Sequence, residues 1–168
     1  MKVVFFEVED WERATFEHLC DRCELQAVSE PLNERNASRF AEAQVVSTFI
    51  HSTLNGGALG RLEKLRFVAT RSTGFDHIDL KYCQENGIAV SNVPTYGDNT
   101  VAEHVFGLLL TISHNLYADI EQTRRGRFAI SGPRGFDLEG KVLGVVGVGA
   151  IGQHVIRIAK GFAMNVVA

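Results

Sequence analysis

The chain has 168 residues, of which 45% are hydrophobic and 22% charged, a composition typical of a soluble globular protein of one domain or one and a part. Its net charge of −3 excludes the basic excess that a nucleic-acid-binding or anionic-membrane-binding surface would bring. Apolar stretches are far shorter than the ~20 residues of a membrane span, and the acidic start does not fit a secretory signal. Three cysteines in a chain of this size fit a reducing cytoplasm, where we expect the protein.

Apolar segments alternate with helical patterns from the first residues onward. The pattern predicts strands at residues 3–8, 24–28, 45–50, 67–70 and 88–91. Helices are predicted between them at residues 11–20, 33–42, 57–65 and 80–86. Asp79 is expected to cap the last of these helices, and Gly87 to end it. Strands separated by helices indicate an α/β fold with a parallel sheet covered on both faces, so residues 1–98 are expected to form a flavodoxin-like, doubly wound domain.

The second part of the chain begins with a loop-rich boundary at residues 92–99. A long helix is expected next, to about Arg125, with Thr100 and Glu103 spaced as a capping box at its start. One apolar stripe at helical spacing predicts its buried face: Val101, Val105, Leu108, Leu109, Ile112 and Leu116. After a loop, the chain continues with a strand, a helix and a further strand, at residues 141–146, 150–160 and 164–168.

Residues 147–152, GVGAIG, have the spacing of the dinucleotide-binding fingerprint and lie between a predicted strand and a predicted helix. Gly147 permits the tight turn, Gly149 lets a pyrophosphate approach the backbone, and Gly152 lets the helix pack closely on the strand. The helix N-terminus offers N–H groups to the phosphates, which adds Ala150 and Ile151 to the candidate site.

Residues 99–168 are therefore expected to be the opening strand–helix–strand of a Rossmann domain with NAD as its cofactor. NADP stays open, because no Asp or Glu follows Glu139 to mark the ribose site. A glycine-rich turn without a ligand is the alternative. Cys20 and Cys23 form a CxxC pair, expected to be two buried thiols rather than a redox or zinc pair, so no metal site is predicted.

Three segments of the chain resemble one enzyme family. They are RSTGFDHID at residues 71–79, NVPTYGDNTVAEH at 92–104 and GFDLEGKVLGVVGVGAIGQ at 135–153. Together they look like the N-terminal half of a D-isomer-specific 2-hydroxyacid dehydrogenase, and VPTY and GFDL resemble the fermentative D-lactate dehydrogenases in particular. The resemblance implies hydride transfer between NAD(H) and a small 2-keto or 2-hydroxy acid, with pyruvate and D-lactate as the expected pair. It also implies that residues 1–98 are the substrate domain.

The resemblance assigns candidate residues in both parts of the chain. It implies that backbone N–H groups of Ser72, Thr73 and Gly74 bind the substrate carboxylate, which such groups at a strand's end can do without a cation. Tyr96 matches a position near the substrate in lactate-type members, with aromatic packing in the linker as the alternative. Val101 matches a residue near the nicotinamide, and it also belongs to the apolar helix stripe.

In this family the Arg, Glu and His that hold the substrate and move the proton match positions beyond Ala168. No catalytic residue is therefore assigned, and we expect this chain alone to have little or no activity. The fingerprint strand would lack a neighbour and the long helix would expose apolar surface, so a homodimer or a segment-exchanged oligomer is expected.

A stand-alone nucleotide-binding or dimerisation module without turnover is the alternative function. A flavodoxin-like flavin or phosphate site is disfavoured, because residues 7–10 after the first strand are acidic and lack a glycine-rich loop.

Overall fold

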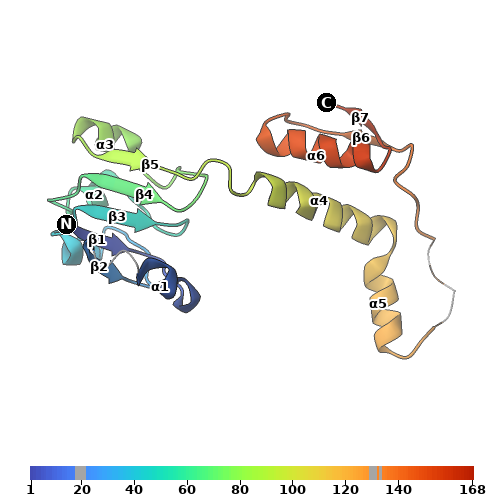
Figure 1. The fold of residues 1–168 in the computed structure, drawn as a ribbon, viewed down its shortest axis with the longest axis horizontal. Coiled ribbons are helices and arrows are strands. Elements are labelled where there is room, and N and C mark those ends of the chain that lie inside the picture. The colour runs from blue at the N-terminus through green and yellow to red at the C-terminus, as the bar shows by residue number, and fades with distance from the viewer. Residues whose placement is uncertain (18–21, 129–131, 133) are drawn as a thin grey trace. The chain divides into compact units, whose positions relative to one another are not determined.

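The structure is a computed structural model that describes residues 1–17, 22–128, 132 and 134–168. The chain divides into two compact units, Met1–Pro94 and Thr95–Ala168, each with its own sheet and apolar core (Figure 1). Within the described ranges, no helix has the length and apolar character needed to cross a membrane.

The sheet of the first unit has five described strands, all parallel, in the order β2-β1-β3-β4-β5. The strands are β1 (Lys2–Phe5), β2 (Glu24–Ala27), β3 (Val45–Thr48), β4 (Phe67–Thr70) and β5 (Ala89–Ser91). The predicted α/β fold with a parallel sheet is therefore confirmed. Because β1 has β2 on one side and β3 on the other, the strand order reverses at β1, and a crevice opens at the carboxyl ends of such strands.

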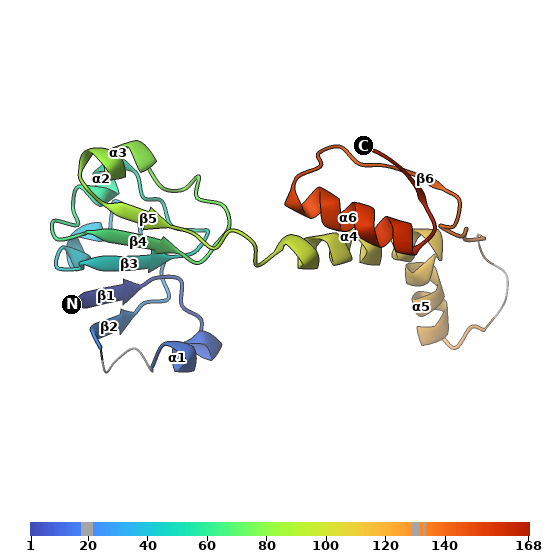
Figure 2. The same cartoon turned by 45° about the horizontal axis from the view of Figure 1, so that its top comes forward.

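Helical segments connect these strands and cover the two faces of the sheet. They are α1 (Asp10–Glu17), the 3₁₀ helix η1 (Ala37–Phe40), α2 (Gly56–Leu59) and α3 (Leu80–Glu85). Side chains alternate along each strand, so Val4 and Val46 belong to the larger core and Val3 and Phe5 to a smaller one that includes Phe16 of α1. In Figure 2, α3 lies near β5 at one edge of the sheet and α1 near β2 at the other.

Two of the predicted helices in this unit are shorter than expected. The helix expected over residues 33–42 is reduced to η1, because Asn33 and Asn36 bind nearby backbone groups with their side chains and so compete with helical hydrogen bonds. The helix expected over residues 57–65 ends at Leu59. By contrast, the Asp79 cap is confirmed, since its carboxylate accepts a hydrogen bond of 2.9 Å from the Tyr82 N–H. Residues 18–20 of the first predicted helix lie outside the described part of the chain.

The second unit contains the predicted strand–helix–strand. Its elements are α4 (Asp98–Ser113), α5 (Leu116–Arg124), β6 (Val142–Gly144), α6 (Ala150–Gly161) and β7 (Asn165–Val167). The strands β6 and β7 pair in parallel, with α6 as their crossover. The helices α4 and α6 lie side by side in both views, and the rings of Phe106 and Phe162 stack with centroids 5.4 Å apart (Figures 1 and 2).

The predicted buried stripe of the long helix is wrong. The face of α4 that packs into the core carries Ala102 and Phe106, whereas much of the predicted stripe is exposed: Val101, Val105, Leu108, Ile112 and Leu116. The helix is apolar on more than one side, so periodicity alone could not choose the face that meets α6. The helix is also not continuous to Arg125, because Asn115 adopts a left-handed conformation with φ +54° that separates α4 from α5.

The predicted capping box at Thr100 and Glu103 is wrong as well. The helix begins at Asp98, so Thr100 lies inside its first turn and cannot act as the cap. The carboxylate of Glu103 instead accepts a hydrogen bond from the side chain of Asn99.

Candidate functional site

The predicted substrate loop follows β4 at the carboxyl edge of the first unit's sheet. Ser72 is buried, whereas Thr73 and Gly74 are exposed. The Ser72 hydroxyl donates to the Gly74 carbonyl at 2.7 Å, and the Asn92 amide donates to the Thr73 carbonyl at 2.8 Å. No described residue accepts a hydrogen bond from the N–H groups of Thr73 and Gly74. Side-chain hydrogen bonds thus hold the loop in shape, while two of its backbone donors have no acceptor among the described residues.

The hydroxyl groups of Thr70 and Ser72 and the imidazole of His77 form a hydrogen-bonded series beneath the exposed part of this loop. The Thr70 hydroxyl lies 2.6 Å from that of Ser72 and 3.4 Å from Nε2 of His77. Because the Ser72 hydroxyl donates to Gly74, Thr70 donates to Ser72, and Nε2 of His77 must carry the proton that it shares with Thr70. Burial lowers the pKa of His77, while the charges of Glu7 and Asp76 act in the opposite direction, so the environment favours the neutral imidazole.

Glu7 is the polar centre of the same edge, and sequence reasoning missed it. Its backbone has φ +57°, a conformation that costs a non-glycine residue on the order of 1–2 kcal/mol. Its carboxylate accepts hydrogen bonds from the N–H groups of Phe49 at 3.0 Å, His51 at 2.8 Å and Ser52 at 3.0 Å. The Ser52 hydroxyl donates to the same carboxylate. Burial alone would raise the pKa of the Glu7 carboxyl, but these hydrogen bonds hold that pKa below its ordinary value.

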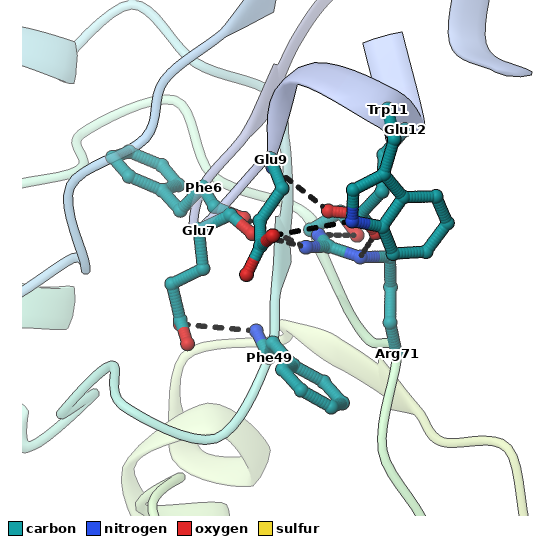
Figure 3. Close-up of polar contacts among 8 residues, drawn as sticks. Phe6, Glu7, Glu9, Trp11, Glu12, Phe49 and Arg71 are labelled. Carbon is teal, nitrogen blue, oxygen red and sulfur yellow. Dashed lines mark hydrogen bonds and ion pairs between the residues drawn. The ribbon is translucent and has the colours of Figure 1, made fainter.

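Arg71, the residue before Ser72, lies against this centre, and Figure 3 shows its guanidinium beside Glu7 and Glu12. Its guanidinium donates to the backbone carbonyls of Phe6 at 2.9 Å and Glu7 at 3.0 Å, and it forms an ion pair with Glu12 at 3.8 Å. Burial lowers the pKa of Arg71, while the charges of Glu12 and Glu7 act in the opposite direction. A guanidinium nevertheless stays protonated in proteins, so Arg71 remains a fixed cation at the start of the loop.

Two hollows at the carboxyl edge share Glu7, Glu9 and Phe49. The larger has a volume of about 420 Å³ and is also lined by His51, and the smaller, of about 200 Å³, includes Trp11 and Arg71. A larger hollow of about 810 Å³ lies elsewhere, beside Val3, Val45 and Phe67, and its lining is almost wholly apolar. Glu7 and Glu9 line both hollows, and their charge disfavours an anion there. The N–H groups of the predicted loop are therefore the candidate contact for a small anionic ligand, rather than these two hollows.

The glycine loop of the second unit has the geometry that its residue types suggest. Gly147 has φ +96°, which only glycine adopts readily. A Cβ on Gly152 would lie 2.1 Å from the Gly147 carbonyl oxygen, so α6 approaches the loop too closely for any side chain there. A Cβ on Gly149 would meet nothing within 4 Å, which leaves open space beside the N-cap of α6.

The first N–H groups of α6 are available to a ligand. In the described part of the chain nothing accepts a hydrogen bond from the N–H groups of Ala150 and Ile151, and the first N–H of α6 with a partner is that of Gln153, which donates to the Gly149 carbonyl. The other candidates of this unit are exposed: Val101 lies in the first turn of α4, and Tyr96 is 58% exposed just before it.

Ser72, Thr73 and Gly74 thus lie together in the first unit, and the remaining candidates lie in the second. The first unit also holds three residues in contact with this loop or with its supports: Glu7, Arg71 and His77. The signal for Arg71 was its place at the start of the RSTG segment, whereas Glu7 stood out in the sequence only as part of an acidic turn.

Comparisons with known proteins agree with the resemblance seen in the sequence. A 2-hydroxyacid dehydrogenase homolog of Haemophilus influenzae is 34% identical over 172 residues, and D-lactate dehydrogenase of Escherichia coli is 30% identical over the same length. Both alignments cover 100% of this chain and 52% of the relative, so the chain spans about half the length of these relatives.

Solved structures of similar fold belong to the same kinds of enzyme. D-lactate dehydrogenase from Aquifex aeolicus, complexed with NAD and lactic acid, superposes with a TM-score of 0.88 at 29% identity, over 98% of this chain and 50% of that one. The apo structure of the Escherichia coli enzyme gives 0.80 at 29% identity, over 98% and 53%. The profile of one family, D-isomer specific 2-hydroxyacid dehydrogenase, catalytic domain, matches residues 3–168. The chain therefore belongs to the D-isomer-specific 2-hydroxyacid dehydrogenase family.

Proposed function

We propose that this chain supplies the substrate loop and the opening of the nucleotide site of an NAD-dependent dehydrogenase that interconverts a small 2-keto acid and its D-2-hydroxy acid, with pyruvate and D-lactate as the pair. The observation that carries the proposal is the exposed loop after β4, whose Thr73 and Gly74 N–H groups have no acceptor among the described residues. In this proposal Met1–Pro94 is the substrate domain and Thr95–Ala168 opens the NAD domain. The odd cysteine count supports a reducing cytoplasm as its location.

The substrate carboxylate would bind to the N–H groups of Thr73 and Gly74. The Ser72 hydroxyl, which is buried and committed to the Gly74 carbonyl, would hold the loop in shape rather than contact the substrate. Ser72 would then contribute to binding through its backbone. Tyr96 is proposed as a further substrate contact, because its side chain is exposed and its position matches the lactate-type motif.

The glycine loop would hold the pyrophosphate of NAD. Open space at Gly149 and the free N–H groups of Ala150 and Ile151 fit a phosphate at the N-terminus of α6. Gly147 and Gly152 would shape the loop without touching the cofactor, and Val101 would lie near the nicotinamide. Bound NAD would supply or accept the hydride. The discrimination between NAD and NADP stays open, because no Asp or Glu follows Glu139 to bind the ribose hydroxyls.

We further propose that this chain alone does not turn over substrate. Proton transfer to the keto oxygen needs an acid such as a histidine oriented by a carboxylate. None of the histidines in the described ranges forms a hydrogen bond with a carboxylate; His77 binds Thr70 and His154 binds Arg157.

The proposal is tested by comparing this chain with the protein expressed from the complete gene. NADH binding is measured by fluorescence titration, and turnover by NADH oxidation with pyruvate and with larger 2-keto acids. Turnover by the complete product, and binding without turnover by the chain, support the dehydrogenase. NADH binding without turnover in both proteins would favour the alternative, a nucleotide-binding or dimerisation module.

We also propose that the protein associates through α4. The exposed residues Val101, Val105, Leu108 and Ile112 follow the 4-3-4 spacing of a helix-pair seam, and Ile112 is 68% exposed. A second copy of the same helix would cover this apolar stripe in an isologous dimer. Light scattering during size exclusion decides the question, since a monodisperse monomer that persists at micromolar concentration contradicts it.

A further inference from the structure

Glu7 holds together three neighbouring strand ends of the first unit. It follows β1, its carboxylate takes hydrogen bonds from residues 49–52 after β3, and its carbonyl oxygen takes one from Arg71 after β4. Figure 3 shows Glu7 pointing toward the Phe49 N–H, with the Arg71 guanidinium placed against the carbonyls of Phe6 and Glu7. The segments joined in this way are 42 to 64 residues apart in the sequence.

The donors around the Glu7 carboxylate form an anion site built by the fold. Three backbone N–H groups, from Phe49, His51 and Ser52, and the Ser52 hydroxyl converge on its two oxygens. Such a cluster binds a carboxylate whether or not it comes from the same chain. The Ser52 hydroxyl also accepts a hydrogen bond of 2.9 Å from the Leu32 N–H, so this cluster is tied to the loop after β2 as well.

The same residue reaches the substrate loop through its backbone. Arg71 donates to the Glu7 carbonyl with its side chain and to the Thr48 carbonyl with its N–H, at 3.0 and 2.8 Å. Ser72 and its exposed neighbours follow directly. A movement of the β1 end or the β3 end therefore moves the residue from which the substrate loop starts.

We propose that Glu7 is a positioning residue for the substrate loop, and that its carboxylate occupies an internal anion site which fixes residues 49–52 and Arg71 relative to Thr73 and Gly74. This role rests on the proposed dehydrogenase function. The contacts of Glu7 form within one unit, so the experiment can separate the positioning role from the activity.

The first measurement is amide hydrogen exchange by NMR on the full chain, with the variants Glu7→Gln and Glu7→Gly. Gln keeps the size of the side chain but turns an amide N–H₂ toward backbone donors. Gly removes the carboxylate and suits the φ of +57°. Faster exchange at Phe49, His51 and Ser52 is expected in both variants, with altered amide shifts at Thr73 and Gly74. Glu9→Gln is the matched control, because the Glu9 carboxylate is exposed and, among the described residues, binds the Trp11 indole alone.

The second measurement is steady-state kinetics of the protein expressed from the complete gene. Glu7→Gln and Glu7→Gly are expected to raise the KM for the 2-keto acid by about tenfold while kcat and the KM for NADH stay close to wild type. Formate should lower the raised KM of Glu7→Gly, because it can enter the vacated anion site, and it should not lower the KM of wild type or Glu7→Gln.

Each outcome decides the proposal. The positioning role is overturned if the folded variants show unchanged exchange and unchanged amide shifts at Thr73 and Gly74. It is also overturned if the KM for the 2-keto acid is unchanged, or if kcat falls as much as KM rises and formate does not restore it. If wild type reduces no 2-keto acid, the proposed function fails, and the exchange data still decide whether Glu7 fixes the loop. If Glu7→Gln does not fold, Glu7→Gly with and without formate gives the answer.

Discussion

Gly152 lies so close to Gly147 that a Cβ on residue 152 would sit 2.1 Å from the Gly147 carbonyl oxygen. The neighbour is backbone and part of a turn with φ +96°, so it has little freedom to move away. The first turn of α6 and the end of the β6 loop can therefore meet only with glycine at position 152. This contact explains the third glycine of the fingerprint by packing alone, without reference to a ligand.

The variant Gly152→Ala should destabilise the second unit by about 2 kcal/mol, because the added methyl must push the helix from the loop. Chemical denaturation followed by amide exchange of α6 measures the change. Gly161→Ala is the control on the same helix: its Cβ position is open, and the substitution should be neutral or slightly stabilising. Equal stability of Gly152→Ala and wild type would contradict the contact.

Gly149→Ala should act on the cofactor and spare the fold. Apart from its own chain neighbours, no described residue has an atom within 4 Å of its Cβ position, so the free energy of unfolding should stay within about 0.5 kcal/mol of wild type. A methyl at this point would occupy the space proposed for the pyrophosphate, and NADH affinity should fall at least about tenfold in a fluorescence titration. Wild-type affinity in this variant would show that the phosphates bind elsewhere.

Features carried by a few adjacent residues were predictable from the sequence. The strand at residues 67–70, the Asp79 cap and the turn at Gly147 each depend on residues within a few positions of one another. The buried face of α4 was not predictable, because contact with α6, some fifty residues later, selects Phe106 over Leu108. Glu7 was missed for the same reason, since its partners begin 42 residues away.

Gly74→Ala should raise the KM for the 2-keto acid in the protein expressed from the complete gene. Among the described residues beyond its chain neighbours, the Asp76 carboxylate alone lies within 4 Å of the Cβ position, at 3.9 Å. The loop should therefore tolerate the methyl, while the space beside its N–H groups shrinks. An increase of about tenfold is expected, with NADH affinity unchanged. Gly107→Ala, on α4 with open space at its Cβ position, is the control and should leave the KM unchanged. A wild-type KM in folded Gly74→Ala would remove this loop from the substrate site.

The stability of the first unit should depend on pH through Glu7. The folded-state pKa of this carboxyl is lowered, so the unfolded chain binds the proton more readily than the folded chain does. The stabilisation is therefore complete above the ordinary carboxyl range and is lost as pH falls through about 4 toward the lowered value. Urea unfolding of wild type and Glu7→Gln between pH 7 and pH 3 measures it. The difference between the two proteins should be largest near neutral pH and should shrink below about pH 4, whereas a difference that stays constant would assign the effect of Glu7 to packing instead of charge.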